Sequence, residues 1–206
     1  MTITTASLRD AIHRIRTSIE ASYVALNELD GKVGDGDLGI TLFKAFRRLD
    51  EIAADLPDDL GRALVTCGSE VSKVSSSSFG TLLATGLFAA SKLVAGKSHA
   101  DWSSISELLQ SAQQAIAARG RSSLGDKTVL DTLAAAAAGA ATRDDPSRIL
   151  AAALSSVDAT IAEFRDKPNR IGRARIFGNE TMGRDDPGMI AFRIMLAALE
   201  KPAVAG

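Results

Sequence analysis

LRDAIHRIRTSIEASYVAL, residues 8–26 of the chain, places its apolar side chains at steps of three and four residues. Steps of this size bring side chains to one face of a helix with 3.6 residues per turn, whereas a half-buried strand alternates strictly. The stretch therefore predicts an amphipathic helix that packs one side against a core. The apolar positions are Leu8, Ile12, Ile15, Ile19, Tyr23 and Leu26.

The same spacing recurs along the rest of the chain, and no segment shows a convincing period of two. Alanine is abundant and clusters of β-branched residues are scarce, which also favours helices. We therefore predict an all-α fold of eight helices, with Ser104 and Glu107 forming a capping box at the start of the fifth. The seven further helices are expected over residues 40–52, 60–71, 79–90, 105–116, 128–143, 145–164 and 186–199.

Length and composition bound the class of protein. The chain has 206 residues, of which 46% are apolar and 24% charged, and its formal net charge is −1. This balance excludes a disordered tail and argues against a nucleic-acid binder, which needs a basic excess. The single cysteine, Cys67, forbids an intrachain disulfide, and neither a signal peptide nor a run of about 20 apolar residues is evident. We expect one domain over residues 1–206, located in the cytoplasm and without a membrane partner.

The connections between the predicted helices are rich in glycine and serine. Glycines cluster within residues 31–39, 120–125 and 172–188, and serines fill positions 75–78. The connection from residue 166 to residue 185 is also far longer than the median loop of about 4–6 residues. Because loops on a rigid scaffold commonly carry function, we expect the functional site in these connections.

The most specific string is DGKVGDGDLG, residues 30–39, which holds three carboxylates within eight positions. Asp30, Asp35 and Asp37 would repel one another and raise their own pKa values unless a cation neutralised them. Hard oxygen ligands suit Mg²⁺, and the helix that follows would direct its free N–H groups toward a phosphate. The string predicts a nucleotide–metal site. Taken alone, it is equally compatible with a glycine-rich turn in which Asp37 is only an N-cap.

Three further strings could bind phosphate, although each is also typical of an ordinary capped loop between helices. The serine run before Phe79 offers hydroxyl and N–H groups at a helix start, and Lys127 lies between Gly125-Asp126 and another helix start. Arg173 lies in the longest connection, where its planar guanidinium could bind a phosphate or a purine.

No covalent nucleophile is evident. The histidines, His13 and His99, and the lone Cys67 lack the sequence context of a catalytic triad or a metal site. Phosphoryl transfer does not require such a group, because positioning and charge stabilisation carry most of its catalysis.

In chain order, these strings resemble one family, the L subunits or nucleotide-binding domains of dihydroxyacetone kinases (the DhaL or DAK2 type). The resemblance covers about residues 8–200. The matching pieces are Leu29-Asp30, Gly34-Asp35-Gly36-Asp37 with Gly39, Phe79-Gly80-Thr81, Gly125-Asp126-Lys127-Thr128 with Leu130-Asp131, Gly172-Arg173-Ala174 with Gly178 and Gly183, and Asp186-Pro187-Gly188.

The resemblance implies a barrel of eight antiparallel amphipathic helices with one rim that binds ADP or ATP through two Mg²⁺ ions. The implied metal ligands, which are also the implied catalytic residues, are Asp30, Asp35 and Asp37. The residues implied to hold the nucleotide are Leu38, Gly39, Ile40, Thr41, Leu42, Ser75, Ser76, Gly125, Asp126, Lys127, Thr128, Arg173, Asp186, Pro187 and Gly188.

The implied activity is phosphoryl transfer to dihydroxyacetone or another short ketose, which a separate K-type subunit would hold through a histidine. In one branch of the family a phosphoprotein of the phosphotransferase system, the M subunit, recharges the bound nucleotide; in the other branch, ATP exchanges freely. We also expect a homodimer and no nucleic-acid partner. Two other hypotheses stay open: a nucleotide-sensing regulatory subunit without phosphotransfer activity, and a helical interaction module without a ligand.

The chain departs from the family pattern at two places. A histidine commonly follows the last metal-binding aspartate, whereas Leu38 stands here. The loop before Phe79 usually reads Gly-Ala-Ser-Gly-Pro-Leu, whereas this chain has Lys73-Val74-Ser75-Ser76-Ser77-Ser78. Both changes bear on the expected phosphate contacts, and they are the features that favour a nucleotide sensor.

Overall fold

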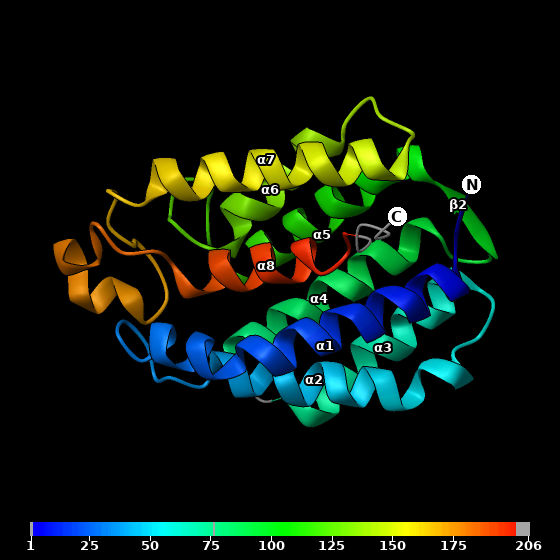
Figure 1. Cartoon of the computed structure of the whole chain (residues 1–206), viewed down its shortest axis with the longest axis horizontal. Helices are drawn as coiled ribbons and strands as arrows, with labels where there is room; N and C mark the ends of the chain where they lie inside the picture. Colours follow the sequence, from blue (N-terminus) through cyan, green and yellow to red (C-terminus); the bar gives the residue numbers. More distant parts are fainter. Residues whose placement is uncertain (1, 76, 201–206) are drawn as a thin grey trace, which may run out of the picture.

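The computed structural model describes residues 2–75 and 77–200 and folds them almost entirely into helices (Figure 1). Two short strands and three 3-10 helices accompany the α-helices: β1 (Thr2–Thr4), β2 (His99–Asp101), η1 (Ala53–Asp55), η2 (Trp102–Ser104) and η3 (Ala174–Thr181). The α-helices of the described residues are α1 (Thr5–Asp30), α2 (Leu38–Ile52), α3 (Leu60–Val74), α4 (Ser78–Leu93), α5 (Ile105–Gly120), α6 (Val129–Ala140), α7 (Pro146–Phe164) and α8 (Pro187–Ala197). Their number and order confirm the all-α prediction.

Helices that follow one another in the chain pack side by side, and α8 closes the arrangement against α1, α6 and α7. The result is the antiparallel helical barrel that the resemblance implies. The antiparallel pairing of β1 with β2, in which Ile3 lies opposite Ala100, is not predicted by the sequence, because three residues are too few to show a period of two. Among the described helices, none has both the length and the apolar character needed to cross a membrane.

Because the helices alternate in direction, every second connection lies at the same end of the barrel. The connections after α1, α3, α5 and α7 share the end at the left of Figure 1, which we call the mouth. Helices α2, α4, α6 and α8 all begin there, whereas the β1–β2 ribbon lies at the opposite end. These four connections contain the strings that the sequence analysis singled out, so the topology itself brings the strings together.

One hydrophobic cluster joins α1, α2, α3, α4 and α8, and its fully buried members include Ile19, Leu42 and Val71. Smaller clusters form between α5 and α6 and between α6 and α7. Phe192 of α8 packs against all three clusters, so the last helix ties the two halves of the barrel together. Cys67 is buried in the first cluster, and this burial raises the pKa of its thiol to about 12, which keeps the thiol unreactive at neutral pH.

Gly39 sets the contact between α1 and α2. A Cβ atom at this position would overlap the backbone carbonyl of Tyr23 and would lie 2.8 Å from Oδ1 of Asn27. A glycine therefore lets the first turn of α2 approach α1 more closely than a residue with a Cβ atom would allow. This close approach fixes the helical hairpin whose turn contains the three aspartates.

The predicted capping box at the start of α5 is wrong. The 3-10 helix η2 runs directly into α5, so Ser104 already has a helical backbone conformation, and its side chain makes no capping hydrogen bond. Its hydroxyl instead donates to the backbone carbonyl of Asp101 at 2.5 Å. The serine closes the 3-10 turn rather than pairing with Glu107.

Candidate functional site

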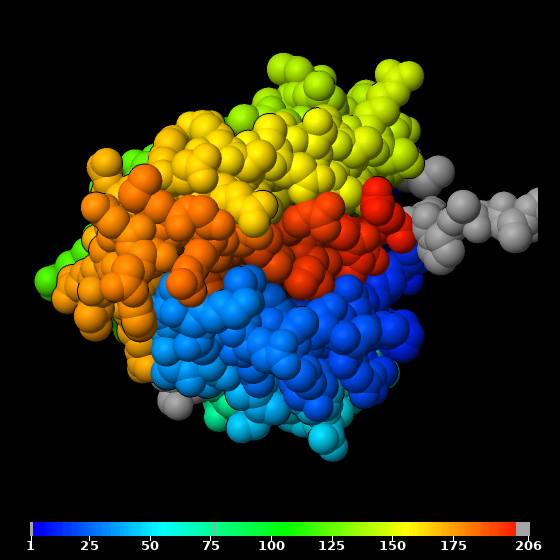
Figure 2. All heavy atoms as spheres, turned by 60° about the vertical axis from the view of Figure 1, so that its left-hand side comes forward, coloured from blue at the N-terminus to red at the C-terminus, as the bar shows by residue number. Residues whose placement is uncertain are grey.

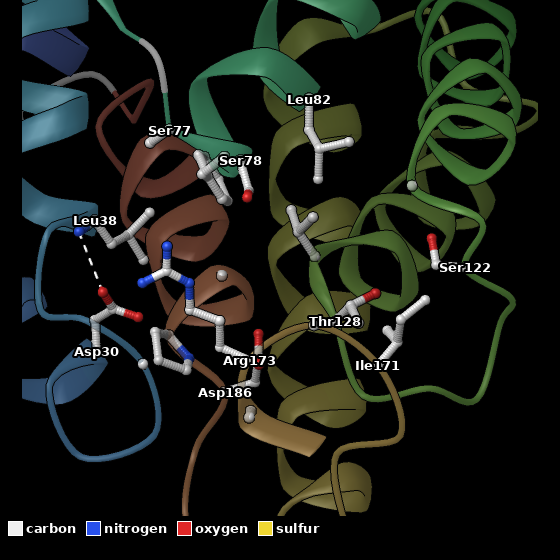
Figure 3. Close-up of a pocket in the computed structure, with 18 of the residues that line it drawn as sticks. Asp30, Leu38, Ser77, Ser78, Leu82, Ser122, Thr128, Ile171, Arg173 and Asp186 are labelled. Carbon is white, nitrogen blue, oxygen red and sulfur yellow. Dashed lines mark hydrogen bonds between the residues drawn. The ribbon is translucent and has the colours of Figure 1, made fainter. Parts of the chain in front are cut away.

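The mouth contains a cavity of about 580 Å³ that all four mouth connections line (Figure 3). Its walls come from residues 30–38, 77–82, 116–130 and 171–188, so segments distant in sequence meet in one place. Figure 2 shows this side of the molecule, where the segment between α7 and α8 (orange) lies against the α1–α2 hairpin (blue). The volume falls within the range of about 300–1,000 Å³ that is typical of small-molecule sites.

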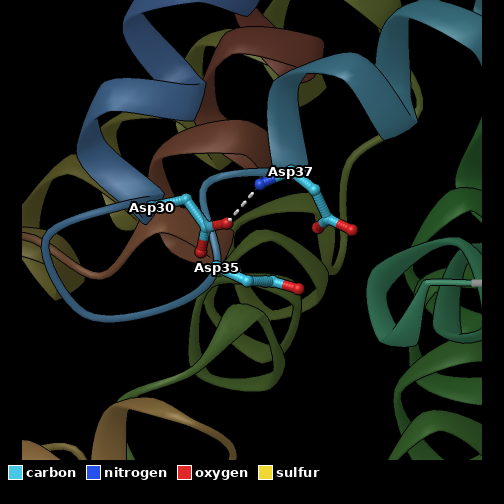
Figure 4. A group of neighbouring side chains, drawn as sticks. All are labelled: Asp30, Asp35 and Asp37. Atoms are coloured by element: carbon cyan, nitrogen blue, oxygen red, sulfur yellow. Dashed lines mark hydrogen bonds between the residues drawn. The ribbon is translucent and has the colours of Figure 1, made fainter.

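The turn between α1 and α2 brings three carboxylates together (Figure 4). One oxygen atom from each of Asp30, Asp35 and Asp37 lies within 4.8 Å of the others. Gly36 permits the turn, because its φ of +75° lies in the left-handed region that side chains disfavour. Gly34 leaves room for Asp30, since a Cβ atom at position 34 would lie 2.5 Å from the Asp30 Oδ1 atom. The glycines of the string thus allow the carboxylates to approach one another.

Asp30 and Asp37 have different roles in this turn. Asp30 accepts hydrogen bonds from the backbone N–H groups of Asp37 (3.0 Å) and Leu38 (3.3 Å) and thereby caps α2. Asp37 occupies the N-cap position, but its side chain makes no capping hydrogen bond to the start of the helix. The interpretation of Asp37 as only an N-cap is therefore wrong, and its carboxylate remains available to a ligand.

The acidic cluster disfavours the ionised form of Asp37. Burial raises the pKa of Asp37, and the nearby charges of Asp35 and Asp30 raise it further. Arg173 and Lys44 oppose this shift without cancelling it. A divalent cation would relieve this repulsion, because it favours the charged form of every carboxylate around it.

The donor set fits Mg²⁺. Three carboxylates supply hard oxygen ligands, and Mg²⁺–oxygen distances of about 2.1 Å put two ligands of one ion at most about 4.2 Å apart. The three oxygen atoms lie within 4.8 Å of one another, which is close to this limit. Small side-chain rotations would therefore let the aspartates share a cation or bridge two.

Arg173 approaches the cluster from the opposite wall. Its guanidinium forms an ion pair with the carboxylate of Asp35. In Figure 3 the side chain extends into the cavity, toward Asp30 and Ser78. The Arg173 and Asp35 side chains are 63% and 39% exposed, and exposed pairs of this kind contribute at most about 1 kcal/mol. The pair is weak enough to separate when a cation or a phosphate competes for its members.

Like α2, the other three helices that begin at the mouth are capped by side chains of the cavity wall. Ser77, Thr128 and Asp186 accept hydrogen bonds from the first N–H groups of α4, α6 and α8. The odd-numbered helices end at the same place, so positive and negative helix ends alternate around the mouth.

Asp186 is a strongly perturbed acid of the cavity wall. Burial raises its pKa to about 6, although hydrogen bonds from Met189 and Asn169 and the charge of Lys127 oppose the shift. The Asn169 Nδ2 atom donates to Asp186 Oδ2 at 2.8 Å. This carboxylate caps α8 and anchors the long connection, and it does not belong to the acidic cluster.

The remaining wall combines apolar side chains with Arg119, Ser122 and Thr128. In Figure 3, Leu82 and Ile171 lie on the side away from Asp30. An apolar wall beside a charged one suits a ligand with a flat ring and an anionic tail. Besides Val33, Leu38, Ala174 and Pro187, the apolar lining residues are Phe79, Leu82, Ile116, Val129, Leu130 and Ile171.

The structure brings many of the predicted site residues to this cavity. Asp35 joins them through the acidic cluster. The predicted residues that line the cavity are Asp30, Asp37, Leu38, Thr128, Arg173, Asp186, Pro187 and Gly188.

The rest of the first turn of α2 does not line the cavity. Gly39 packs against α1, Leu42 lies in the core, and the N–H group of Ile40 donates to Asn27 Oδ1 at 3.0 Å. Thr41 is buried as well. These residues face α1 and the core because the close helix contact at Gly39 turns only Leu38 toward the mouth.

The serine loop contributes different residues from those predicted. Ser75 does not line the cavity, and its hydroxyl lies 3.3 Å from that of Ser77. Ser76 lies outside the described residues. Ser77 and Ser78 line the cavity instead.

Gly125, Asp126 and Lys127 shape the turn before α6 rather than the cavity wall. The N–H group of Gly125 donates to Asp131 Oδ1 at 2.6 Å, and Asp126 Oδ2 accepts from the N–H group of Ser123 at 2.7 Å. Lys127 is 1% exposed, and its ammonium group is bound by backbone carbonyls. The expectation that Lys127 contacts phosphate is corrected accordingly.

Sequence reasoning missed Arg119, Ser122 and the apolar wall. Arg119 belongs to the last turn of α5, and nothing in its local sequence distinguishes it from a solvated helix end. The apolar residues show the same helical spacing as core positions, so periodicity could not separate the two. The serine run indicated the right loop, and within it the prediction of Ser75 was wrong, whereas Ser76 lies outside the described residues.

The chain belongs to the DAK2 domain family, whose model matches residues 32–201. It is 28% identical over 182 residues to the ADP-binding subunit DhaL of the PEP-dependent dihydroxyacetone kinase 1 of Listeria innocua, with 87% of each chain covered. The ADP-binding subunit DhaL of Escherichia coli is 23% identical, with 88% of each chain covered. These comparisons confirm the resemblance that the four strings indicate.

Longer proteins contain the same kind of domain. The triokinase/FMN cyclase of Rattus norvegicus is 26% identical over 93% of this chain, which spans 35% of that protein. The crystal structure of the dihydroxyacetone kinase of C. freundii matches with a TM-score of 0.75 and 25% identity, over 94% of this chain and 34% of that one. The structure of that kinase in complex with AMP-PNP and Mg²⁺ has the same TM-score at 24% identity. This chain therefore spans about a third of these enzymes and shares the fold of that part.

Proposed function

We propose that this chain is the ADP- or ATP-binding, Mg²⁺-dependent subunit of a dihydroxyacetone-type kinase. It would pass a phosphoryl group to a short ketose held on a separate K-type subunit. The observation that carries the proposal is the acidic cluster at one wall of a cavity whose other wall includes the apolar side chains of Leu82 and Ile171. Membership in the DAK2 family and the similarity to ADP-binding subunits support a nucleotide as the ligand.

Two Mg²⁺ ions are expected at Asp30, Asp35 and Asp37. Nucleotide phosphates are anionic, so they could not approach three carboxylates unless cations lay between them. Bound Mg²⁺ would neutralise the charge on the transferred phosphoryl group. When Asp35 turns toward a cation, the guanidinium of Arg173 becomes free to bind the phosphates.

The walls of the cavity suggest how the nucleotide is oriented. We place the phosphates beside Arg173 and the hydroxyl groups of Ser77 and Ser78, and the purine against the apolar wall at Leu82 and Ile171. This orientation leaves the last phosphate near the exposed Asp35, at the edge of the cavity, where an acceptor on another subunit can reach it. Arg173 would then hold the phosphoryl group in line with the acceptor hydroxyl.

Leu38 is the residue that favours an alternative function. Leu38 lines the cavity at the position where the family commonly has a histidine, and its side chain cannot donate a hydrogen bond to phosphate. This observation favours a nucleotide-sensing regulatory subunit, which would bind ADP without transferring a phosphoryl group.

Calorimetric titration followed by a coupled assay tests the proposal. We expect ADP to bind in the presence of Mg²⁺ and not in EDTA, and we expect ketose phosphorylation only when a K-type subunit is added. Nucleotide binding without turnover would favour the sensor. Absence of binding would overturn the proposal in favour of a ligand-free helical module.

Four further features of the proposal do not follow from the geometry of the cavity. A homodimer, an M-type phosphoprotein as phosphate donor, a cytoplasmic location and a single domain over residues 1–206 stay predictions. Light scattering of the purified chain would test the first. Transfer from a phosphorylated M-type protein to bound ADP would test the second.

A further inference from the structure

Lys127 is buried behind the cavity and is fully occupied with backbone groups. Its side chain is 1% exposed, and its φ of +60° is unusual for a residue other than glycine. Its ammonium group donates to the carbonyl oxygens of Arg165 (3.0 Å), Lys167 (2.8 Å) and Thr181 (2.9 Å). An ammonium group has three N–H donors, and each has a partner here.

The three carbonyl groups lie at the two ends of one loop. Arg165 and Lys167 follow the end of α7, and Thr181 closes the 3-10 helix η3. The N–H group of Asn169 also donates to Thr181 Oγ1 at 2.9 Å. This bond joins the same two ends of the loop. Arg173 lies within the loop that these bonds close.

The closed loop is fastened to the start of α6 by bonds next to Lys127. The carbonyl of Lys127 accepts a hydrogen bond from Asn169 Nδ2 at 2.7 Å, and the N–H group of Arg170 donates to the carbonyl of Asp126 at 3.0 Å. Thr128, the next residue in the chain, caps α6 and lines the cavity. The loop and this cavity wall therefore share one rigid attachment.

We propose that Lys127 is a positioning residue that sets the place of Arg173 in the cavity by fixing both ends of the 165–181 loop to the start of α6. Lys127 does not touch the ligand; it acts through Arg173. The ammonium group suits this role because it satisfies three carbonyl oxygens at once and lies at the negative end of the α7 dipole. The inference rests on the proposed nucleotide site, in which Arg173 binds phosphate.

A double-mutant cycle on Mg-ADP affinity tests the proposal. Lys127→Met keeps the length and the burial of the side chain but removes its donors, and we expect it to weaken Mg-ADP binding by about tenfold or more. Arg173→Ala should have a comparable effect. The double variant should be no weaker than the weaker single variant, because one residue acts through the other. Additive losses would overturn the proposal.

A control variant separates positioning from general loss of stability. Val157 is fully buried between α6 and α7 and does not line the cavity, so Val157→Ala destabilises the barrel without touching the loop. We expect its Mg-ADP affinity to equal that of the wild type. If Val157→Ala weakens binding as much as Lys127→Met, destabilisation explains the effect and the proposal is overturned.

Limited trypsin digestion without nucleotide tests the attachment independently of the proposed function. Arg170, Arg173 and Arg175 offer cleavage sites inside the loop. We expect faster cleavage there in Lys127→Met than in the wild type or in Val157→Ala. If the wild type binds no Mg-ADP, the proposed function fails, whereas faster cleavage still supports the attachment. Unchanged cleavage overturns it.

Lys127→Gln provides a second variant that keeps part of the donor set. Its amide retains two N–H donors, so we expect Mg-ADP affinity and loop cleavage between those of the wild type and Lys127→Met. It also replaces Lys127→Met in the cycle should that variant not fold. Affinity and cleavage equal to those of the wild type would overturn the proposal, because removing a donor and the charge would then have no effect.

Discussion

The α1–α2 turn and the α7–α8 connection face each other across the cavity and use their polar residues in opposite ways. Glycines shape the short turn, and its Asp37 side chain stays available to a ligand. In the long connection, Asn169 and Thr181 are 5% and 0% exposed and serve internal hydrogen bonds, while Arg173 extends into the cavity. A short turn between two packed helices can present several ligands directly. A long connection first needs a polar core of its own before it can hold one side chain in place.

The largest effect is expected in the short turn. Asp37→Asn removes a negative charge that faces the cavity, and we expect Mg-dependent ADP binding to weaken by about 100-fold or more. The circular dichroism spectrum should be unchanged, because Asp30 and not Asp37 caps α2. Asp144→Asn, an exposed aspartate between α6 and α7, is the matched control and should bind normally. Tight binding by Asp37→Asn would contradict the role assigned to the turn.

A substitution in the long connection should lower the stability of the fold. Thr181 Oγ1 donates to the carbonyl of Gly178 at 2.7 Å and accepts from the N–H group of Asn169. Thr181→Val leaves both groups without this partner, so the free energy of unfolding should fall by about 1–3 kcal/mol. Urea denaturation measures the change. Thr66→Val, which removes a hydroxyl bonded only within α3, should cost much less. If both variants lost the same free energy of unfolding, the buried hydrogen bonds of Thr181 would not stabilise the connection.

Arg173 is expected to contribute to Mg-ADP affinity and very little to the stability of the fold. Arg173→Gln should weaken Mg-ADP by about tenfold, because a charge-assisted hydrogen bond contributes about 1.5–3 kcal/mol. The metal-free protein should lose less than about 1 kcal/mol of stability, since the Arg173–Asp35 pair is exposed. Calorimetry and urea denaturation measure the two quantities. Arg175→Gln, on the same segment and outside the cavity, should change neither.

The last expected effect is a pH dependence of stability at the start of α8. The pKa of Asp186 in the folded protein, about 6, exceeds the ordinary value of 3.8, so its contribution to stability is fully present below about pH 3.8 and is lost as the pH rises through 6. Asp186→Asn keeps a capping residue and removes the titration. In EDTA, the stability of the wild type relative to this variant should decrease between about pH 4 and pH 7. A constant difference would show that burial does not perturb this carboxyl.

Most of the fold was predictable because its information is local. Each helix has an apolar stripe, and Pro146 and Pro187 follow the aspartates that cap α7 and α8. The lining of the cavity was predictable where a residue of a singled-out string faces the mouth, as at Asp37 and Arg173. The role of Lys127 was not predictable, because its partners are carbonyl groups 38 to 54 residues further along the chain. Nor does the sequence tell Asp30 from Asp37, since only the path of the turn decides which carboxylate meets the N–H groups of α2.

Because an even number of helices alternates in direction, the first helix begins and the last helix ends at the same end of the barrel. The β1–β2 ribbon and the end of α8 accordingly both lie away from the mouth, toward the right of Figure 1. A fluorophore, an affinity handle or a surface linker joined near either of them would stand clear of the cavity. Protein immobilised in this way would present its mouth to the solution, which suits it to binding measurements on a sensor surface.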